Sequence, residues 1–251
     1  MAARAATFHL GILGNAAAGQ ASNNTVKRPH FPPTRPARYS AAMATLTLSR
    51  LGLRWPDGAV QFAGLDLDIA PGVTLLQGDS GSGKTTLLRA LTGELPASGR
   101  VTLGGRTRAD DPAAWARDVA FVDADDAALD PLTPEGVATL LGERHGALDA
   151  ARWQRHFDAF GLRPHADKAM FQLSTGSRRK VVLAALLAAS CPLVLLDEPG
   201  AGLDAASLRH LRQALAEAHA DAARTWLVIA SFGLDGLACN ATVALASRES
   251  A

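Results

Sequence analysis

A glycine-rich stretch in the first half of the chain combines the residue types that bind phosphate. It reads Gly78-Asp79-Ser80-Gly81-Ser82-Gly83-Lys84-Thr85-Thr86, with apolar runs at 73–76 before it and 87–91 after it. Strand, glycine loop and helix in this order turn backbone N–H groups and the positive helix end toward one anion. We expect Lys84 to reach the β- and γ-phosphates of a nucleoside triphosphate and the Thr85 hydroxyl to bind Mg²⁺. The alternative is a chance glycine-rich turn, and the flanking runs argue against it.

Two adjacent carboxylates follow a second apolar run, Leu193 to Leu196. A continuous apolar run is typical of a buried parallel strand, and open parallel sheets bind ligands at the carboxyl ends of their strands. We expect Asp197 to bind Mg²⁺, which prefers one or two carboxylates together with phosphate oxygens and water. Glu198 is then placed to orient or deprotonate an attacking water. An acidic strand end that merely faces solvent is the alternative, and the glycine-rich loop argues against it.

The elements that must position these residues read as an α/β fold. Apolar residues alternate with polar ones at 46–48 and 65–69, which predicts half-buried antiparallel strands. Buried strands are expected at 73–76, 119–122, 193–197, 226–230 and 243–245, and helices after Lys84, at 181–189 and at 208–223. Residues from about 134 to 172 change to helical spacing, which predicts a small helical insert.

Composition narrows the class of protein. The apolar content of 48% supports a substantial core, and the two cysteines, Cys191 and Cys239, lack metal-ligand spacing, which fits a reduced cytosolic setting. Residues 1–42 hold five basic residues and no acidic ones, so the rest carries 20 basic against 24 acidic residues, which argues against a nucleic-acid partner. The longest uncharged run, 181–196, contains Pro192 and is shorter than the roughly 20 residues that a bilayer requires.

The first 42 residues have no sustained periodicity and are expected to be disordered. Their acid-poor, Arg- and Ser-containing composition also fits an organelle transit peptide. A third interpretation is that Met43 is the natural start, because an alternating strand opens just after it. We therefore expect an N-terminal extension at 1–42 and one domain at 43–248, with its helical part at about 130–180.

Together, the motifs resemble those of an ATP-binding-cassette (ABC) ATPase from about Ala44 to Ala246. Gly78 to Thr85 matches the Walker A motif, Leu193 to Asp197 matches Walker B with Glu198 at the catalytic glutamate, and Gly200 to Asp204 resembles the D-loop. The resemblance implies a RecA-like parallel-sheet core, an N-terminal antiparallel β subdomain and a small α-helical subdomain. It also places Trp55 where the family stacks an aromatic ring on adenine; the alternative is an ordinary core or surface tryptophan.

Leu173-Ser174-Thr175-Gly176-Ser177 resembles the family signature Leu-Ser-Gly-Gly-Gln. This stretch can form a second anion-binding site, because Ser174 at a helix N-cap and the amide near Gly176 could bind a γ-phosphate. The resemblance implies that two copies, or two paired cassettes, dock head to tail and sandwich two ATP molecules, with Asp204 of the D-loop at the nucleotide. Without the glycine-rich loop, Ser174 would be simply a helix cap.

Two positions depart from the family pattern. The Q-loop glutamine should follow the strand at 119–122, where the chain has Ala124, or Asp123 or Asp125 if the alignment slips, and the switch histidine is replaced by Phe232. A methyl group and a phenyl ring offer no hydrogen bond to water, Mg²⁺ or phosphate. Thr175 and Ser177 also differ from the signature. The resemblance thus implies ATP binding with slow or partner-dependent hydrolysis.

The function implied is the ATP-binding subunit of an ABC transporter. It would lie in the cytoplasm on the inner face of the cell membrane and contact separate transmembrane permease subunits through its helical insert and the groove near 123–131. Its compactness is more like that of small exporter cassettes, including the haem-export type. A soluble ATP switch acting on a protein partner is the alternative; a P-loop kinase would leave the signature stretch unexplained.

Overall fold

The computed structural model describes residues 44–146, 148–230, 234 and 236–245. All of them belong to one compact unit, residues 31–251. The N-terminal extension at 1–42 and Phe232 lie outside the described residues, so the expectations for them stay predictions.

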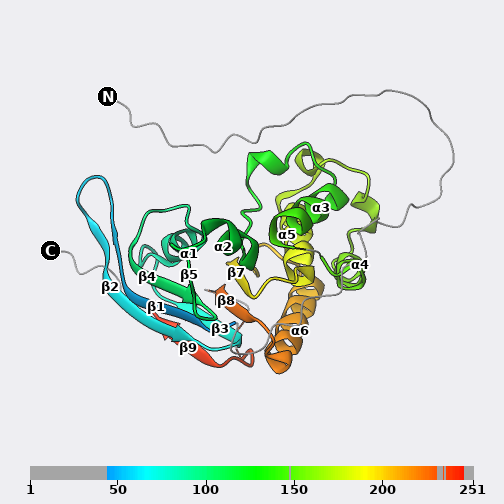
Figure 1. Cartoon of the computed structure of the whole chain (residues 1–251). Coiled ribbons are helices and arrows are strands. Elements are labelled where there is room, and N and C mark those ends of the chain that lie inside the picture. Colours follow the sequence, from blue (N-terminus) through cyan, green and yellow to red (C-terminus); the bar gives the residue numbers. More distant parts are fainter. Residues whose placement is uncertain (1–43, 147, 231–233, 235, 246–251) are drawn as a thin grey trace, which may run out of the picture. The chain divides into compact units, whose positions relative to one another are not determined.

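The first half of the chain builds an antiparallel sheet (Figure 1). Its strands are β1 (Leu46–Arg54), β2 (Val60–Ile69), β4 (Ser98–Leu103) and β5 (Arg106–Thr107), in the order β2-β1-β4-β5. Leu46, Leu48 and Leu51 point into the core, while Thr47, between the first two, is only half-buried. The alternation at 46–48 and 65–69 therefore predicted this sheet correctly.

A second sheet is parallel throughout its described pairings and carries the ends of the expected site. Its strands are β6 (Val119–Ala120), β7 (Leu193–Asp197), β8 (Thr225–Ile229), β3 (Gly72–Gln77) and β9 (Ala241–Ala244), in the order β6-β7-β8-β3-β9. Leu76 and Asp197 both pair with Ile229, from the two sides of β8. The ends of β3 and β7 are therefore level, and the loop after Gln77 starts beside Asp197.

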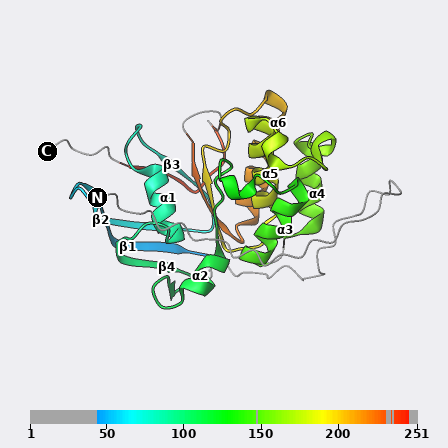
Figure 2. The same cartoon turned by 90° about the horizontal axis from the view of Figure 1, so that it is seen from above.

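The parallel sheet separates two cores. Val194 and Leu196 of β7 face one core, and Leu193 and Leu195 face the other, as the period of two in a strand requires. The first core contains α3 (Pro134–His145), α4 (Ala150–Ala159), α5 (Thr175–Ala188) and α6 (Ala205–Asp221); the second contains α1 (Lys84–Thr92) and the antiparallel sheet. Figure 2 shows these helices on opposite sides of the sheet.

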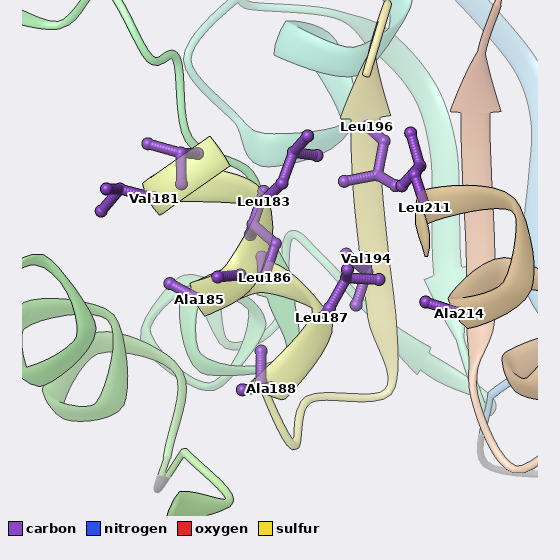
Figure 3. Close-up of a cluster of buried hydrophobic side chains, with 14 of the residues drawn as sticks. Val181, Leu183, Ala185, Leu186, Leu187, Ala188, Val194, Leu196, Leu211 and Ala214 are labelled. Carbon is purple, nitrogen blue, oxygen red and sulfur yellow. The ribbon is translucent and has the colours of Figure 1, made fainter. Parts of the chain in front are cut away.

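Helix α5 joins the helical insert to the sheet. Its residues from Val181 to Ala188 are all buried, and α3 and α4 pack against it. Figure 3 shows Leu183, Leu186 and Leu187 of α5 near Val194 and Leu196 of β7. The expected helical insert and the α/β arrangement with two subdomains beside a parallel core are thus confirmed.

Three elements differ from the expectation. The buried strand expected at 243–245 is β9 at Ala241–Ala244, an edge strand whose residues are mostly exposed. The strand expected at 119–122 ends at Ala120, since Phe121 and Val122 leave the sheet and are only half-buried. A helix that the periodicity did not predict, α2 (Pro112–Asp118), buries Trp115, whose indole donates to the carbonyl of Leu91. Its signal was Asp111 as N-cap followed by proline at the first helical position.

Candidate nucleotide-binding site

The glycine-rich loop, called the P-loop here (residues 78–86), joins β3 to α1 at the carboxyl edge of the parallel sheet. Gly83 caps α1 with φ of 94°, and a Cβ there would lie 2.3 Å from the side-chain nitrogen of Gln61. A Cβ at Gly78 would lie 2.7 Å from the carbonyl oxygen of Leu245. Both positions therefore require glycine. No side chain caps α1 and its first turn holds no acidic residue, so its first N–H groups can take an anion.

Lys84 closes this loop. Its Nζ donates to the carbonyl oxygen of Gly78 at 2.7 Å and to that of Asp79 at 2.9 Å. An ammonium group has three N–H donors, so one remains for a phosphate oxygen. The lysine thus holds the loop in shape and keeps its positive charge at the same place.

The two expected magnesium ligands are in direct contact. The Thr85 hydroxyl donates to Oδ2 of Asp197 at 2.7 Å, so the first turn of α1 meets the end of β7. Burial raises the pKa of Asp197, the bond from Thr85 opposes this, and the neighbouring carboxylate of Glu198 adds to it. A hydroxyl and a carboxylate side by side are the oxygen ligands that Mg²⁺ prefers.

Glu198 follows in an unusual backbone conformation. Its φ is 45°, a left-handed value that costs energy in a residue with a Cβ. The conformation is held by two backbone bonds, from the Glu198 N–H to Ile229 and from the Ala201 N–H to the Glu198 carbonyl, both 3.0 Å. The fold thus fixes the position of the predicted catalytic glutamate.

Trp55 and Gln61 form the far wall of the same cleft. The Trp55 indole donates to Oε1 of Gln61 at 3.3 Å, and the ring is half-buried. The cleft has a volume of about 570 Å³ and is lined by Trp55, Gln61, Ser80, Gly81, Gly83, Lys84, Thr85, Thr86, Asp197 and Glu198. Sequence reasoning missed Gln61, because nothing in the pattern of β2 sets it apart.

The residues of this cleft fit a nucleoside triphosphate with Mg²⁺. Among the described residues, two buried side-chain atoms lack a hydrogen-bond partner, Nε2 of Gln61 and Oγ of Ser82. Buried polar atoms normally have a partner, so the amide of Gln61, which lines the cleft, is suited to a polar ligand, whereas Ser82 is buried and does not line the cleft. Gly81, where a Cβ would meet nothing within 4 Å, leaves the loop backbone open to a close approach, and Thr85 with Asp197 supplies the predicted metal ligands.

The predicted signature residues lie at the start of α5, outside this cleft. Ser174 is the N-cap of α5: its Oγ accepts the N–H of Ser177 at 3.2 Å and its hydroxyl donates to Oγ of Ser177 at 3.0 Å. A Cβ at Gly176 would lie 3.3 Å from the carbonyl oxygen of Gly202. The helix start therefore packs closely on the segment 200–204.

Two basic residues that sequence reasoning did not single out complete this contact. Lys180 forms an ion pair with Asp204, and Arg179 donates to the carbonyl of Ala201 at 2.9 Å. The bond from Lys180, with two more from Ser207, lowers the pKa of Asp204, which also caps α6. The signal available was the basic triplet 178–180 directly after the signature.

Comparison with known proteins decides the family. The ABC transporter family model matches residues 62–201, more than half of the chain. The chain belongs to the ABC transporter family. The ABC cassette fold also recurs in solved structures: one described as the ATP-binding subunit of an ABC transporter superposes with a TM-score of 0.71 at 22% identity, covering 80% of this chain and 86% of the other.

Two sequence relatives of this ABC protein and one further solved structure have names that refer to transport. The cytochrome c biogenesis ATP-binding export protein CcmA of Paramagnetospirillum magneticum is 40% identical over 64% of this chain and 76% of its own length. The Fe(3+) ions import ATP-binding protein FbpC 2 of Rhodococcus jostii is 37% identical over 68% of this chain and 51% of its own length. CbiO1 of Clostridium perfringens, described as part of the ABC transporter complex cbiONQ, superposes with a TM-score of 0.63 at 23% identity, covering 80% of this chain and 84% of the other.

The family match and the CcmA relative make the chain an ATP-binding subunit of the ABC class and an ATP hydrolase. Within the described ranges, no helix has both the length and the hydropathy that crossing a bilayer requires.

The segment after β6 is where we expect the family's Q-loop glutamine. Ala124 presents a methyl group, and its neighbour Asp123 pairs with Arg89 of α1 at 3.5 Å. Asp123 also accepts the N–H of Asp125 at 2.9 Å. A groove of about 320 Å³ brings Asp123 and Ala124 together with Thr85, Asp197 and Glu198. Asp123 and Asp125 are thus the polar side chains from this segment that line the groove beside the predicted metal ligands.

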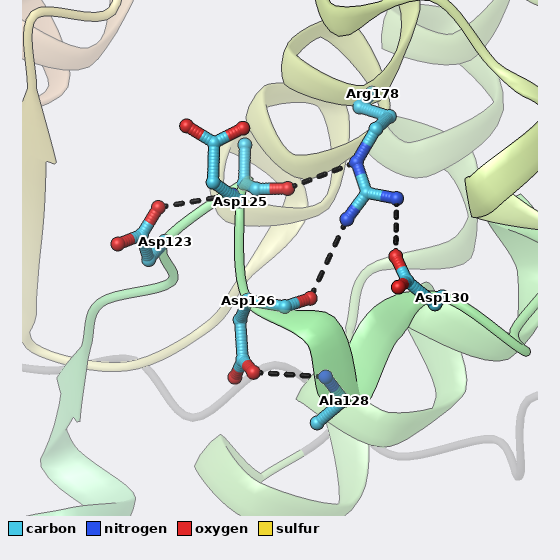
Figure 4. A network of polar contacts seen from close by, with 7 residues as sticks. Asp123, Asp125, Asp126, Ala128, Asp130 and Arg178 are labelled. Carbon is cyan, nitrogen blue, oxygen red and sulfur yellow. Dashed lines mark hydrogen bonds and ion pairs between the residues drawn. The ribbon is translucent and has the colours of Figure 1, made fainter.

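Arg178, on the first turn of α5, holds the segment 123–130 in place (Figure 4). It donates from Nε to the Ala124 carbonyl at 3.1 Å and from Nη2 to the Asp126 carbonyl at 3.4 Å. It also pairs with Asp130 at 2.6 Å, and its side chain is only 12% exposed. Helix α5, which starts at the predicted signature, is therefore linked to residues 123–130, called the Q-loop segment here, by one side chain that sequence reasoning did not identify as functional.

Proposed function

We propose that this ABC cassette is the MgATP-binding and hydrolysing subunit of a transporter, formed by about residues 43–248 with its helical part at about 130–180. The observation that carries the proposal is the 2.7 Å bond between Thr85 and Asp197 beside the loop that Lys84 closes. It unites the predicted phosphate and metal ligands at one sheet edge, as the Walker A and Walker B motifs require.

Each residue of the cleft has a role in this proposal. The P-loop amides and Lys84 hold the phosphates, and Thr85 and Asp197 hold Mg²⁺, which when bound offsets phosphate charge. Trp55 stacks on the adenine, and Glu198 orients and deprotonates the attacking water. The fixed backbone of Glu198 supports this last role, because a catalytic group acts best from a preorganised position.

A second cassette would complete the nucleotide site. Ser174, Gly176 and Asp204 do not line the cleft of their own chain, yet they sit in one tight contact between the signature and the D-loop. We propose that they contact the ATP held by the partner, in a head-to-tail pair of identical or related cassettes. The Ser174 N-cap then adds a helix N-terminus to the bound γ-phosphate.

The groove beside the Q-loop segment is the proposed contact with transmembrane permease subunits on the inner face of the cell membrane. It combines apolar side chains such as Val122, Leu183 and Leu186 with the charged residues 123 and 125. The names of CcmA, FbpC 2 and the CbiO1 complex, an exporter, an importer and a transporter part, support a transport role without fixing the direction.

Hydrolysis is proposed to be slow or to depend on a partner. The methyl group of Ala124 cannot hydrogen-bond water or metal, and the sequence has Phe232 where the family has a histidine. Losing one preorganised contact to a developing charge costs on the order of 10²–10³ in rate.

Single-turnover hydrolysis by the purified full chain tests this proposal. We expect tight MgATP binding and slow turnover, which Glu198→Gln reduces further while ATP affinity is kept. A rate equal to that of ABC ATPases that have both the Q-loop glutamine and the switch histidine would refute slow turnover. Identifying the chains that co-purify from detergent extracts tests the proposed partner. A polytopic membrane protein among them would support the transport role. A soluble protein alone would favour the alternative function, an ATP switch acting on a protein partner.

A further inference from the structure

A separate cleft lies on the helical side of the parallel sheet, between α4, α6 and the start of β8. It has a volume of about 270 Å³, and its charged and polar lining comprises Arg152, Arg155, His156, Glu217, Asp221 and Arg224. None of the predicted nucleotide, metal, signature or D-loop residues lines it. We call it the arginine cleft.

Arg224 is the feature of the arginine cleft that requires an explanation. The residue is only 9% exposed, and its guanidinium lies 4.8 Å from the centre of the Trp226 ring. One N–H donates to the carbonyl of Ala189, but no carboxylate among the described residues pairs with it within 4.0 Å. Burial lowers the pKa of this guanidinium to about 10. The charges of Asp221 and Asp149 partly oppose this lowering, but neither carboxylate pairs with the guanidinium. A buried cation whose four other N–H donors have no partner among the described residues is costly unless an anion in contact offsets it.

The other charges of the arginine cleft are arranged at its rim. Arg155 pairs with Glu217 at 3.1 Å, and these side chains are 54% and 46% exposed. Arg152 pairs with Asp149, outside the cleft lining, at 3.7 Å. Exposed pairs of this kind contribute only about 0–1 kcal/mol, so both arginines can share an incoming anion at little cost.

The histidine of the arginine cleft adds no charge near neutral pH. His156 is buried, its Nδ1 lies 3.0 Å from Nε2 of His210, and burial with nearby arginines lowers its pKa to about 3. Its neutral ring is therefore a hydrogen-bonding wall. The lining holds three arginines and two carboxylates, and Asp149 balances the third arginine only from outside it, so the excess of positive charge is confined to the lining.

We propose that the arginine cleft binds a small oxyanion, a phosphate or carboxylate group, with Arg224 as the buried anchor and Arg152 and Arg155 as outer contacts. The planar guanidinium matches both groups because it can donate two parallel bonds. The volume lies just below the roughly 300–1,000 Å³ of drug-sized ligand pockets, so one small anion fits better than a second nucleotide. Bound there, the anion ties α4 of the helical insert to β8 of the sheet.

Calorimetric titration of the full chain with inorganic phosphate tests the site. The protein carries Lys84→Ala so that phosphate contacts at the P-loop are weakened, and sodium chloride keeps the ionic strength constant. We expect saturable binding in the millimolar range, which Arg224→Met weakens by at least about tenfold, since a charged hydrogen-bond partner is lost. Arg155→Met should weaken it less. Arg209→Met is the matched control, because Arg209 is exposed on α6 and does not line the cleft.

Titration with acetate instead of phosphate separates the two chemistries. Saturation by either anion that depends on Arg224 supports the proposal and names the group. Binding that is equally strong in Arg224→Met and Arg209→Met, or heat that never saturates, would overturn it. If Arg224→Met fails to fold by circular dichroism, the double variant Arg152→Met/Arg155→Met decides, with unchanged phosphate affinity counting against the arginine cleft.

Discussion

The two sides of the candidate site are held in different ways. The P-loop edge, residues 78–86 with Asp197 and Glu198, is shaped by backbone: glycines at tight positions, a helix start without a side-chain cap, and a left-handed glutamate pinned by main-chain bonds. The signature side, residues 123–130 with the start of α5, is held by long charged side chains, above all Arg178 and Lys180.

This difference between the two sides coincides with a difference in sequence. The P-loop edge follows the ABC motifs, and the signature side departs from them at the positions that we expect to align. The P-loop edge has the glycines and the lysine that the proposed phosphate binding needs, while on the signature side Ala124 stands where we expect the family's glutamine. A site made of main-chain amides depends on few side chains, but those few are decisive. Binding and turnover can therefore be altered independently, and the following predictions test that separation.

The largest effect is expected from Lys84→Ala. It removes the only side-chain cation that lines the P-loop cleft among the described residues, together with the two bonds that close the loop. A hydrogen bond to a charged group is worth about 1.5–3 kcal/mol, so ATP affinity should fall roughly 10- to 100-fold. Equilibrium dialysis with ATP measures this, with the exposed Lys168→Ala as control. Unchanged affinity in the Lys84 variant would refute the phosphate assignment.

Ala124→Gln should act in the opposite direction, on rate rather than affinity. Arg178 holds the backbone carbonyl of residue 124, so a longer side chain starts from a fixed point beside Thr85 and Asp197. One preorganised polar contact is worth on the order of 10²–10³, and with Phe232 still present we expect roughly tenfold faster single-turnover hydrolysis. Ala127→Gln, three residues further along on an exposed turn, is the control. An equal rate in both variants would mean that Ala124 does not limit turnover.

Much of the P-loop edge could be predicted from sequence because its signals are local. Each motif predicts the local conformation of its own residues: the glycine spacing before Lys84 predicts a loop and a helix start, and the apolar run predicts a strand that ends in carboxylates. In the structure, Thr85 contacts Asp197, as the two motifs imply. The order of motifs also predicted the parallel sheet. Those signals need only neighbours within a few residues.

The contacts that escaped prediction join distant segments. Gln61 accepts a hydrogen bond from Trp55 and lies beside Gly83 of the loop. Arg178 donates to the carbonyl of Ala124, which is 54 positions away in the sequence. A single arginine or glutamine in a sequence does not indicate its partner, because long side chains reach several candidates. The arginine cleft depends in the same way on α4, α6 and β8 meeting in space.

A smaller effect, on stability, is expected from Arg178→Met. The arginine is largely buried and makes two bonds to carbonyl groups and one ion pair to Asp130. Losing them should lower the free energy of unfolding by about 1–3 kcal/mol. Arg179→Met, which removes one exposed bond to Ala201, should change it by no more than about 0.5 kcal/mol. Urea unfolding of both variants checks the contrast, and equal losses would show that Arg178 does not hold the signature side specially.

Mild acid should separate the helical insert from the P-loop edge, with the smallest expected effect. Burial lowers the pKa of His145 in α3 to about 4 and that of His156 in α4 to about 3, against about 6.5 in an unfolded chain. The unfolded chain therefore binds more protons below pH 6.5, so the stability that these neutral histidines contribute is complete above pH 6.5 and is lost as the pH falls toward 4. The slope reaches at most ~1.4 kcal/mol per pH unit for each histidine.

His156→Gln should flatten this dependence, compared with the unchanged chain, by up to one proton. Urea unfolding between pH 7 and 5.5 measures both slopes, in a window above the range where most carboxylates titrate. Hydrogen exchange in the same window should show earlier opening of α3 and α4 than of β3 and α1, because both histidines belong to the helical insert. If the two regions open together at every pH, the helical insert and the P-loop edge unfold as one unit, and acid does not distinguish them.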